Sequence, residues 1–143
     1  MVNNKFVGTW RLRSITSRSV DGAAAYPYGP DAAGYITYTD DGFMAVSIMS
    51  AGRPAYATGD QMGGTVEEKA AAANTYLTYH GRYTVLPDRV IHHSEICLYP
   101  NWIGADIVRF YRFDGDVLTL TAPPTLVNGA IRTNEIVWER MRQ

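Results

Sequence analysis

Histidine and acidic side chains gather in one short segment of the chain and are its best candidates for acid–base chemistry. His92 and His93 are adjacent, and Glu95 follows two residues later. Side chains two residues apart on a strand share a face, so His93 and Glu95 would lie together. A carboxylate beside an imidazole orients it and strengthens it as a general base. The simpler alternatives are a polar pair on the outer surface of a sheet and, for His92, a histidine buried in the core.

The same segment does not have the spacing of a metal site. Adjacent residues on a strand point to opposite faces, so His92 and His93 are poorly placed to bind one ion. The chain offers one other histidine, His80, and a single thiol, Cys97. The sequence also lacks a glycine-rich phosphate loop, a nucleophile elbow and a C-x-x-C pair. We therefore expect neither a metal nor a cofactor.

Aromatic residues and arginines suit a second kind of chemistry, the recognition of a small molecule. The chain has ten tyrosines, four phenylalanines and three tryptophans, and such side chains often line ligand pockets. A phenol can polarise a carbonyl group, and a guanidinium can pair with a carboxylate. The candidate phenol donors are Tyr35, Tyr38, Tyr79, Tyr83 and Tyr111. The residues expected to line the binding site are Trp10, Tyr35, Tyr83, Trp102, Arg109, Tyr111 and Trp138. Their alternative role is as amphipathic wall residues of the fold.

Turn dipeptides such as Asp41-Gly42 and Asp114-Gly115 separate short runs of β-branched and aromatic residues. This pattern is typical of an antiparallel sheet. Eight evenly spaced strands favour a sandwich or a barrel. The predicted strands are residues 9–18, 34–39, 43–49, 81–86, 89–98, 105–113, 117–122 and 133–141.

Alternation along the last strand places Ile136, Trp138 and Arg140 on the face opposite two glutamates, and we expect this face to point inward. Trp10 shares its face of the first strand with Leu12 and Ser14. Arg140 stacked on an indole would close one end of a barrel through a cation–π contact, unless it is a solvated C-terminal charge. For residues 89–98, the more apolar set, which would conventionally face inward, is Val90, His92, Ser94, Ile96 and Leu98, but the sequence leaves the orientation of this strand open. Neither face of residues 105–113 is purely polar, so the sequence leaves their orientation open.

One segment, about residues 66–78, is predicted to be a helix. Thr65 and Glu68 have the spacing of a capping box, and four alanines follow. The preceding segment, residues 52–64, contains four glycines and one proline. We predict that this segment and the helix cover one mouth of a barrel, with Tyr56 or Met62 near the opening, and that the segment is more mobile than the strands. The alternative is a helix packed on the outer wall.

The composition fits a globular chain and excludes several classes of function. The 143 residues suit a single domain, 1–143, with a sizeable core. A net charge of −1 without a basic stripe gives no reason to expect nucleic acid as a partner. No apolar run reaches the roughly 20 residues of a membrane span. A single cysteine and the absence of a signal-peptide pattern lead us to expect a cytoplasmic protein.

An ordered set of motifs resembles the lipocalin-like domain family of bacterial and fungal proteins. Phe6-Val7-Gly8-Thr9-Trp10 is similar to the G-x-W motif that opens lipocalin sequences. Further similar segments, in order, are GYITYT at 34–39, YHGRY at 79–83, LYPNWIG at 98–104 and VWER at 137–140. The resemblance implies a mainly-β fold, an up-and-down antiparallel β-barrel with one helix. Lipocalin-like barrels as a class bind small hydrophobic molecules, and some small barrels instead catalyse cyclisations or isomerisations without a cofactor.

Three functions therefore stay open. The first is binding of a small, largely apolar molecule inside the barrel. The second is a cofactor-independent isomerase, cyclase or lyase for a small hydrophobic, polyketide- or terpenoid-like substrate, with His92, His93 and Glu95 as acid–base residues. The third is homodimerisation through the barrel exterior, with an interior that is only core. The direction in which the two histidines point discriminates the first function from the second.

Overall fold

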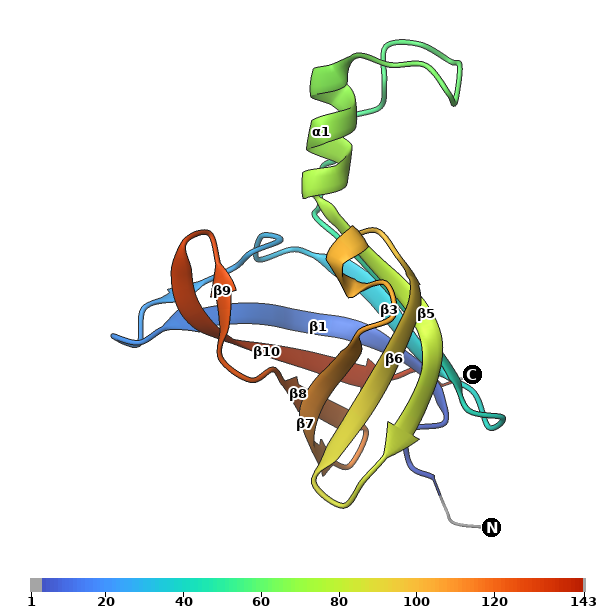
Figure 1. Ribbon diagram of the computed structural model, residues 1–143, viewed down its shortest axis with the longest axis vertical. Helices are drawn as coiled ribbons and strands as arrows, with labels where there is room; N and C mark the ends of the chain where they lie inside the picture. The colour runs from blue at the N-terminus through green and yellow to red at the C-terminus, as the bar shows by residue number, and fades with distance from the viewer. Residues whose placement is uncertain (1–3, 143) are drawn as a thin grey trace.

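Eight antiparallel strands close into a barrel in this computed structural model, which describes residues 4–142 (Figure 1). Each strand pairs with the next along the chain, and the last returns to pair with the first. The barrel strands are β1 (Gly8–Ser19), β3 (Ala33–Tyr38), β4 (Phe43–Met49), β5 (Tyr76–Val85), β6 (Arg89–Cys97), β7 (Asp106–Asp114), β8 (Val117–Thr121) and β10 (Ala130–Arg140). The predicted mainly-β, up-and-down barrel of about eight strands is confirmed.

Short elements complete the fold among the described residues. Strand β2 (Ala24–Ala25) pairs with β1, and β9 (Thr125–Val127) pairs with β10. A 3-10 helix, η1 (Pro100–Trp102), connects β6 to β7. The one α-helix, α1 (Val66–Asn74), ends earlier than predicted because residues 76–79 pair with β4 as the start of β5. The β-branched and aromatic residues there favour a strand over a longer helix.

Interactions around Trp10 and Arg140 close the end of the barrel where the chain enters. The Arg140 guanidinium carbon lies 4.1 Å from the Trp10 ring centroid, which confirms the predicted stacking. Arg140 also donates hydrogen bonds to the carbonyl oxygens of Lys5 and Val7, at 2.6 and 2.9 Å. The Trp10 indole donates to the carbonyl oxygen of Phe6 at 2.9 Å. These bonds fix the segment before β1 across the end of the barrel.

A β-bulge changes the inward face of β1. Leu12 and Ser14 pair with consecutive residues of β10, so Arg13 is an extra residue in β1. An extra residue reverses the alternation beyond it. Ile15 is therefore buried, at 4% exposure, whereas Ser14 turns outward. The prediction that Ser14 shares the inward face of Trp10 and Leu12 is wrong for this reason.

A second bulge does the same in β6. Ser94 and Ile96 pair with consecutive residues of β5, so Glu95 is the extra residue. The predicted inward set is correct as far as Ser94, which is 1% exposed. Beyond the bulge it is wrong, since Ile96 is 74% exposed and Leu98 is 39% exposed. Cys97 packs against the core in their place.

The segment between β4 and β5, residues 50–75, projects away from the barrel instead of covering it. Figure 1 shows α1 standing beyond the start of β5, away from the barrel, and no residue of the helix is buried. Met62 is 83% exposed and Val66 is 80% exposed. The predicted cover and the alternative of a helix on the outer wall are both wrong. A helix faced with alanines offers little apolar area to hold it against the barrel.

The predicted capping box does form in α1. The Glu68 amide donates to the Thr65 hydroxyl at 3.1 Å, and the Thr65 amide donates to the Glu68 carboxylate at 2.9 Å. Within residues 4–142, no helix combines the length and the apolar character that crossing a membrane requires.

Candidate functional site

His92 lies in the middle of the barrel between two tyrosine hydroxyl groups. The inward face of β6 presents it with Val90 and Ser94, and its side chain is fully buried. The Tyr38 hydroxyl, from β3, lies 2.7 Å from Nε2 of His92. The Tyr79 hydroxyl, from β5, lies 2.7 Å from Nδ1. Three strands therefore contribute to one polar centre, which we call the Tyr–His–Tyr centre.

The imidazole of this centre is neutral at ordinary pH. Burial first, and then the nearby positive charge of Arg109, lower the pKa of His92 from 6.5 to about 3. Burial likewise raises the pKa of both Tyr38 and Tyr79, so the two phenols keep their protons. The centre is thus three uncharged polar groups in an apolar surrounding.

One tyrosine O–H of the Tyr–His–Tyr centre has no hydrogen-bond acceptor within the described residues. A neutral imidazole has one N–H and one unprotonated nitrogen, so one tyrosine donates to His92 and the other accepts from it. The accepting tyrosine still carries its own hydroxyl hydrogen. Within residues 4–142 neither hydroxyl has another partner. The tautomer of His92 decides whether Tyr38 or Tyr79 offers this free O–H to the interior.

Other inward polar groups lack partners as well. The Ser94 hydroxyl, the Trp138 indole N–H and the Asn134 amide oxygen are buried without a hydrogen bond in the described chain. Ser94 and Trp138 are each 1% exposed. Buried polar atoms normally find a partner, so such atoms call for an explanation. They come from β6 and β10, which contribute to different parts of the barrel wall.

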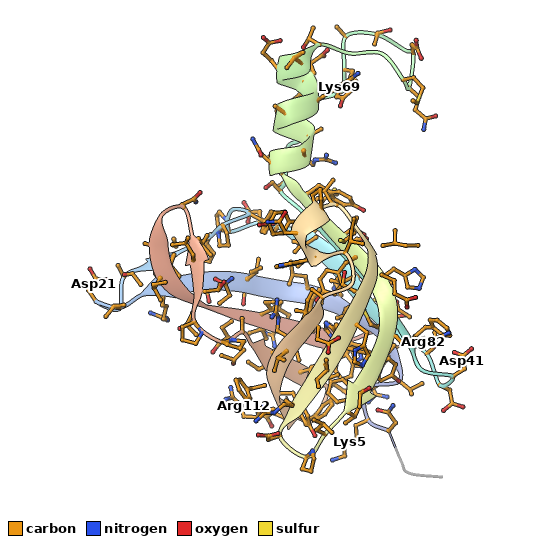
Figure 2. All side chains as sticks on the ribbon, viewed as in Figure 1. Lys5, Asp21, Asp41, Lys69, Arg82 and Arg112 are labelled. Carbon is orange, nitrogen blue, oxygen red and sulfur yellow. The ribbon has the colours of Figure 1, made fainter. Side chains whose placement is uncertain are left out.

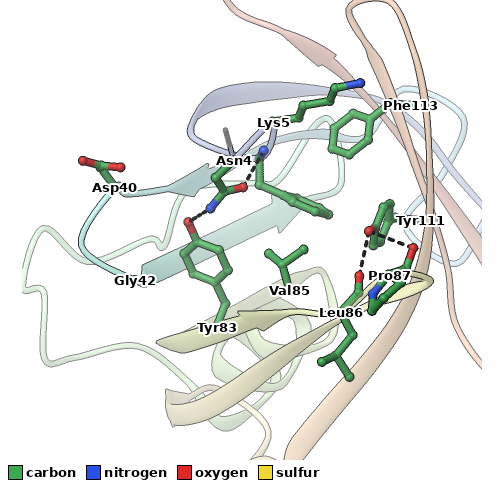
Figure 3. Close-up of a pocket in the computed structure, with 11 residues that line it drawn as sticks. Asn4, Lys5, Asp40, Gly42, Tyr83, Val85, Leu86, Pro87, Tyr111 and Phe113 are labelled. Carbon is green, nitrogen blue, oxygen red and sulfur yellow. Dashed lines mark hydrogen bonds between the residues drawn. The ribbon is translucent and has the colours of Figure 1, made fainter. Parts of the chain in front are cut away.

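A pocket of about 740 Å³ opens at the end of the barrel opposite α1, where the N-terminal segment crosses it (Figure 3). This volume is within the range of small-molecule sites. Its aromatic lining is Phe6, Tyr83, Tyr111 and Phe113, and Asn4, Lys5 and Asp40 supply polar groups at its rim. Figure 3 shows the Tyr111 hydroxyl bonded to the carbonyl oxygens of the β5–β6 turn, which holds that wall in place.

Phe6 separates this pocket from the Tyr–His–Tyr centre. Its side chain is 1% exposed, and its ring meets those of Tyr38, Tyr111 and Phe113 edge to face, at centroid distances of 4.9–5.0 Å. Tyr38 also packs edge-on against Tyr83, at 4.9 Å. Tyr38 therefore belongs to both regions, since its ring lies in the aromatic layer and its hydroxyl contacts His92.

The other predicted ligand residues divide by strand orientation. Trp10 and Trp138 are buried inside the barrel, and Arg109 faces inward beside Val90. Trp102 is half-buried at the α1 end, where it packs edge-on against Tyr79. Tyr35 is 52% exposed on the outer face of β3, so its expected place in the lining is wrong. The inward residues of β3 are Ile36 and Tyr38.

The predicted acid–base pair lies on the outside of the barrel. The ring nitrogens of His93 lie 2.7 Å from the Asp106 carboxylate and 2.8 Å from the Thr84 hydroxyl. Glu95 instead accepts a hydrogen bond from the Arg82 amide at 3.1 Å. His93 and Glu95 therefore share no partner and do not reach the interior, which contradicts their predicted role in a cavity. In the described residues no group of metal-binding side chains is assembled.

Sequence reasoning missed Asn134 and much of the pocket lining, including Asn4, Lys5, Phe6, Val85 and Phe113. The motif around Trp10 gave a signal for Phe6, but nothing in the sequence shows that its ring closes the aromatic layer. The period-two pattern of Tyr79 and Tyr83 with a glycine between them does indicate their common inward face.

Residues 7–141 match the model of the family described as a lipocalin-like domain, and the chain belongs to that family. A curated relative is the 4'-hydroxy-3'-methoxypropiophenone carrier protein ppsC of Aspergillus oryzae. It is 36% identical over 108 residues, which cover 68% of this chain and 96% of the relative. No solved structure matches the chain significantly.

Proposed function

We propose that the protein is a carrier that binds a small, largely apolar aromatic molecule in the barrel, at the end with the pocket. The observation that carries the proposal is the cavity of about 740 Å³ with aromatic rings as its floor. Aromatic rings offer a large apolar contact area with favourable edge-to-face and stacked geometries. Asn4 and Lys5 supply polar contacts at the rim, and the hydroxyl and indole donors deeper in the barrel come within reach where a ligand displaces the Phe6 ring.

The relative supports the same chemistry. Its name assigns it an aromatic ketone that bears a hydroxyl and a methoxy group. A ligand of this class has a flat apolar ring and several oxygen acceptors. The free tyrosine O–H and the Trp138 N–H are donors that complement such acceptors.

Filling the pocket tests this function. Val85 lines the cavity, and a Val85→Trp variant would occupy part of its volume. We expect 4'-hydroxy-3'-methoxypropiophenone to bind the parent chain saturably. The Val85→Trp variant should bind it at least about tenfold more weakly. Isothermal titration calorimetry measures both. The matched control is Val20→Trp, at a position that is 91% exposed and outside the pocket. Equal binding by the Val85 variant and the parent chain would contradict this location.

Cofactor-independent isomerisation is the second candidate, and the Tyr–His–Tyr centre favours it. A neutral imidazole can accept a proton at one nitrogen and release one from the other, while a phenol polarises a carbonyl oxygen. An aryl ketone in deuterated water would then exchange its α-hydrogens faster with the protein than without it. Proton NMR follows this exchange. A Tyr38→Phe or Tyr79→Phe variant that leaves an observed exchange rate unchanged would exclude the centre as its source.

A further inference from the structure

Arg109 is an inward-facing cation without an acidic partner in the part of the chain that the structure describes. Its neighbour in the strand register is Val90, which is fully buried, and Ile107 on the same face is 6% exposed. Its only hydrogen bond there runs from Nη1 to the carbonyl oxygen of Val108, at 2.9 Å. Arg13, Arg89, Arg140 and Arg142 by contrast all lie within ion-pair distance of a carboxylate.

The position of Arg109 joins the pocket to the Tyr–His–Tyr centre. Tyr111, which lines the pocket, is two residues further along the same face of β7, a spacing of about 7 Å. In the other direction, the charge of Arg109 helps to lower the pKa of His92 after burial, and it opposes the rise that burial causes in the pKa of Tyr38 and Tyr79. Arg109 does not line the pocket, so a ligand would meet this guanidinium where its acidic group displaces the Phe6 ring and reaches inward.

Most of the unpartnered polar groups in the barrel interior can donate a hydrogen bond. The free tyrosine O–H and the Trp138 N–H donate, the Ser94 hydroxyl can donate or accept, and the Asn134 amide oxygen accepts. No aspartate or glutamate of residues 4–142 is buried. A half-buried cation without a counter-ion is costly, and a guanidinium is complementary to negative oxygen.

We infer that the barrel selects aromatic ligands that carry an acidic oxygen group, such as a carboxylate or an acidic phenol, and that Arg109 is the counter-ion of that group. The inference rests on the proposed carrier function and specifies its ligand class. His92 contributes no charge to this recognition because it is neutral at the pH of binding. The ligand supplies the negative charge that no side chain brings to the interior.

Two fluorescent probes of the same skeleton test the charge. One is 1-anilinonaphthalene-8-sulfonate, which is anionic, and the other is N-phenyl-1-naphthylamine, which is neutral. We expect saturable one-to-one binding, with the anion bound about tenfold more tightly than the neutral probe. An Arg109→Met variant should lose this preference and keep its affinity for the neutral probe. The matched control is Arg112→Met on the same strand, whose side chain projects outward (Figure 2) and which should keep the preference.

The outcomes separate this inference from the function on which it rests. A parent chain that binds both probes equally, or an Arg109→Met variant that keeps the preference, would overturn the inference and leave the carrier function standing. A parent chain that binds neither probe would count against both. Thermal unfolding would show whether Arg109→Met fails to fold. In that case the inference requires that the parent chain prefers the anionic probe and that Arg109→Lys keeps this preference, and loss of the preference in a folded Arg109→Lys variant would overturn it.

Discussion

The barrel and the excursion between β4 and β5 are held together in different ways. In the barrel, residues far apart in the chain are in register, and large side chains such as Trp10, Met44 and Leu118 are fully buried. In the excursion, residues 50–75, the bonds are local. Arg53 donates to the carbonyl oxygen of Ala72 at 3.0 Å, and the Ala57 amide donates to Glu68 at 2.9 Å. The first region depends on long-range packing and the second on local hydrogen bonds.

The candidate site lies in the barrel, the region with long-range packing, and not in the excursion. The pocket is lined by the N-terminal segment and by strands and turns of the barrel, and no residue of the excursion lines it. Figure 1 shows α1 at one end of the molecule and the β5–β6 turn, which borders the pocket, at the other. The packed barrel therefore positions the candidate site, and the excursion leaves that pocket open.

A methyl group at Gly81 is expected to produce the largest effect. Its Cβ would lie 1.8 Å from the carbonyl oxygen of His93, because the bulge in β6 brings the two backbones close. Gly81→Ala should lower the free energy of unfolding by about 3 kcal/mol, since only a backbone shift relieves the overlap. Chemical denaturation measures the change. The matched control in the excursion is Gly59→Ala, where a Cβ meets nothing within 4 Å, and it should stay within about 0.5 kcal/mol. Equal effects would contradict the contrast between the two regions.

Acid should destabilise the barrel through His92. The pKa of His92 is lowered to about 3 in the folded chain, against 6.5 for an ordinary histidine, so the unfolded chain binds the proton more readily. The stability that this residue contributes is complete above pH 6.5 and is lost progressively as the pH falls toward 3. Between pH 6.5 and 5 the loss should be about 2 kcal/mol. Urea unfolding at the two pH values should show this loss in the parent chain, and a markedly smaller one in His92→Gln. An equal loss in both would assign the acid sensitivity to other groups.

The sequence predicted the strands and the helix because these depend on local patterns. Turn dipeptides, β-branched runs and the Thr65–Glu68 capping box all act within a few residues. It could not predict the two bulges, since an extra residue such as Glu95 is recognised only against its partner strand. The inward direction of His92 and Trp138 was therefore predictable, whereas the outward turn of Ile96 was not.

The same limit applied to the candidate site. His93 and Glu95 were predicted as an acid–base pair because they are close in sequence. The hydrogen-bond partners of His92 instead come from β3 and β5. The neighbours of a residue inside a barrel belong to other strands, and one sequence does not give their register. Tyr35 was misplaced because the composition of β3 alone does not reveal which of its tyrosines faces inward.

The smallest expected effect concerns the cap of α1. Thr65→Ala removes the hydroxyl that accepts from the Glu68 amide, a loss of about 1 kcal/mol for the helix itself. Because α1 has no buried residue, the loss should stay local. We expect the free energy of global unfolding to change by less than about 0.5 kcal/mol. Amide exchange within residues 66–74 should accelerate severalfold, while the strand amides keep their rates.

Thr16→Ala is the matched control for this last variant, because Thr16 lies within β1, where it pairs with Glu135 of β10. Any change in exchange that it causes should appear in β1 and β10 and leave α1 unaffected. A Thr65→Ala variant that lowers the global free energy of unfolding by more than about 1 kcal/mol would mean that α1 unfolds together with the barrel. The excursion would then be part of the cooperative unit, although none of its helical side chains is buried.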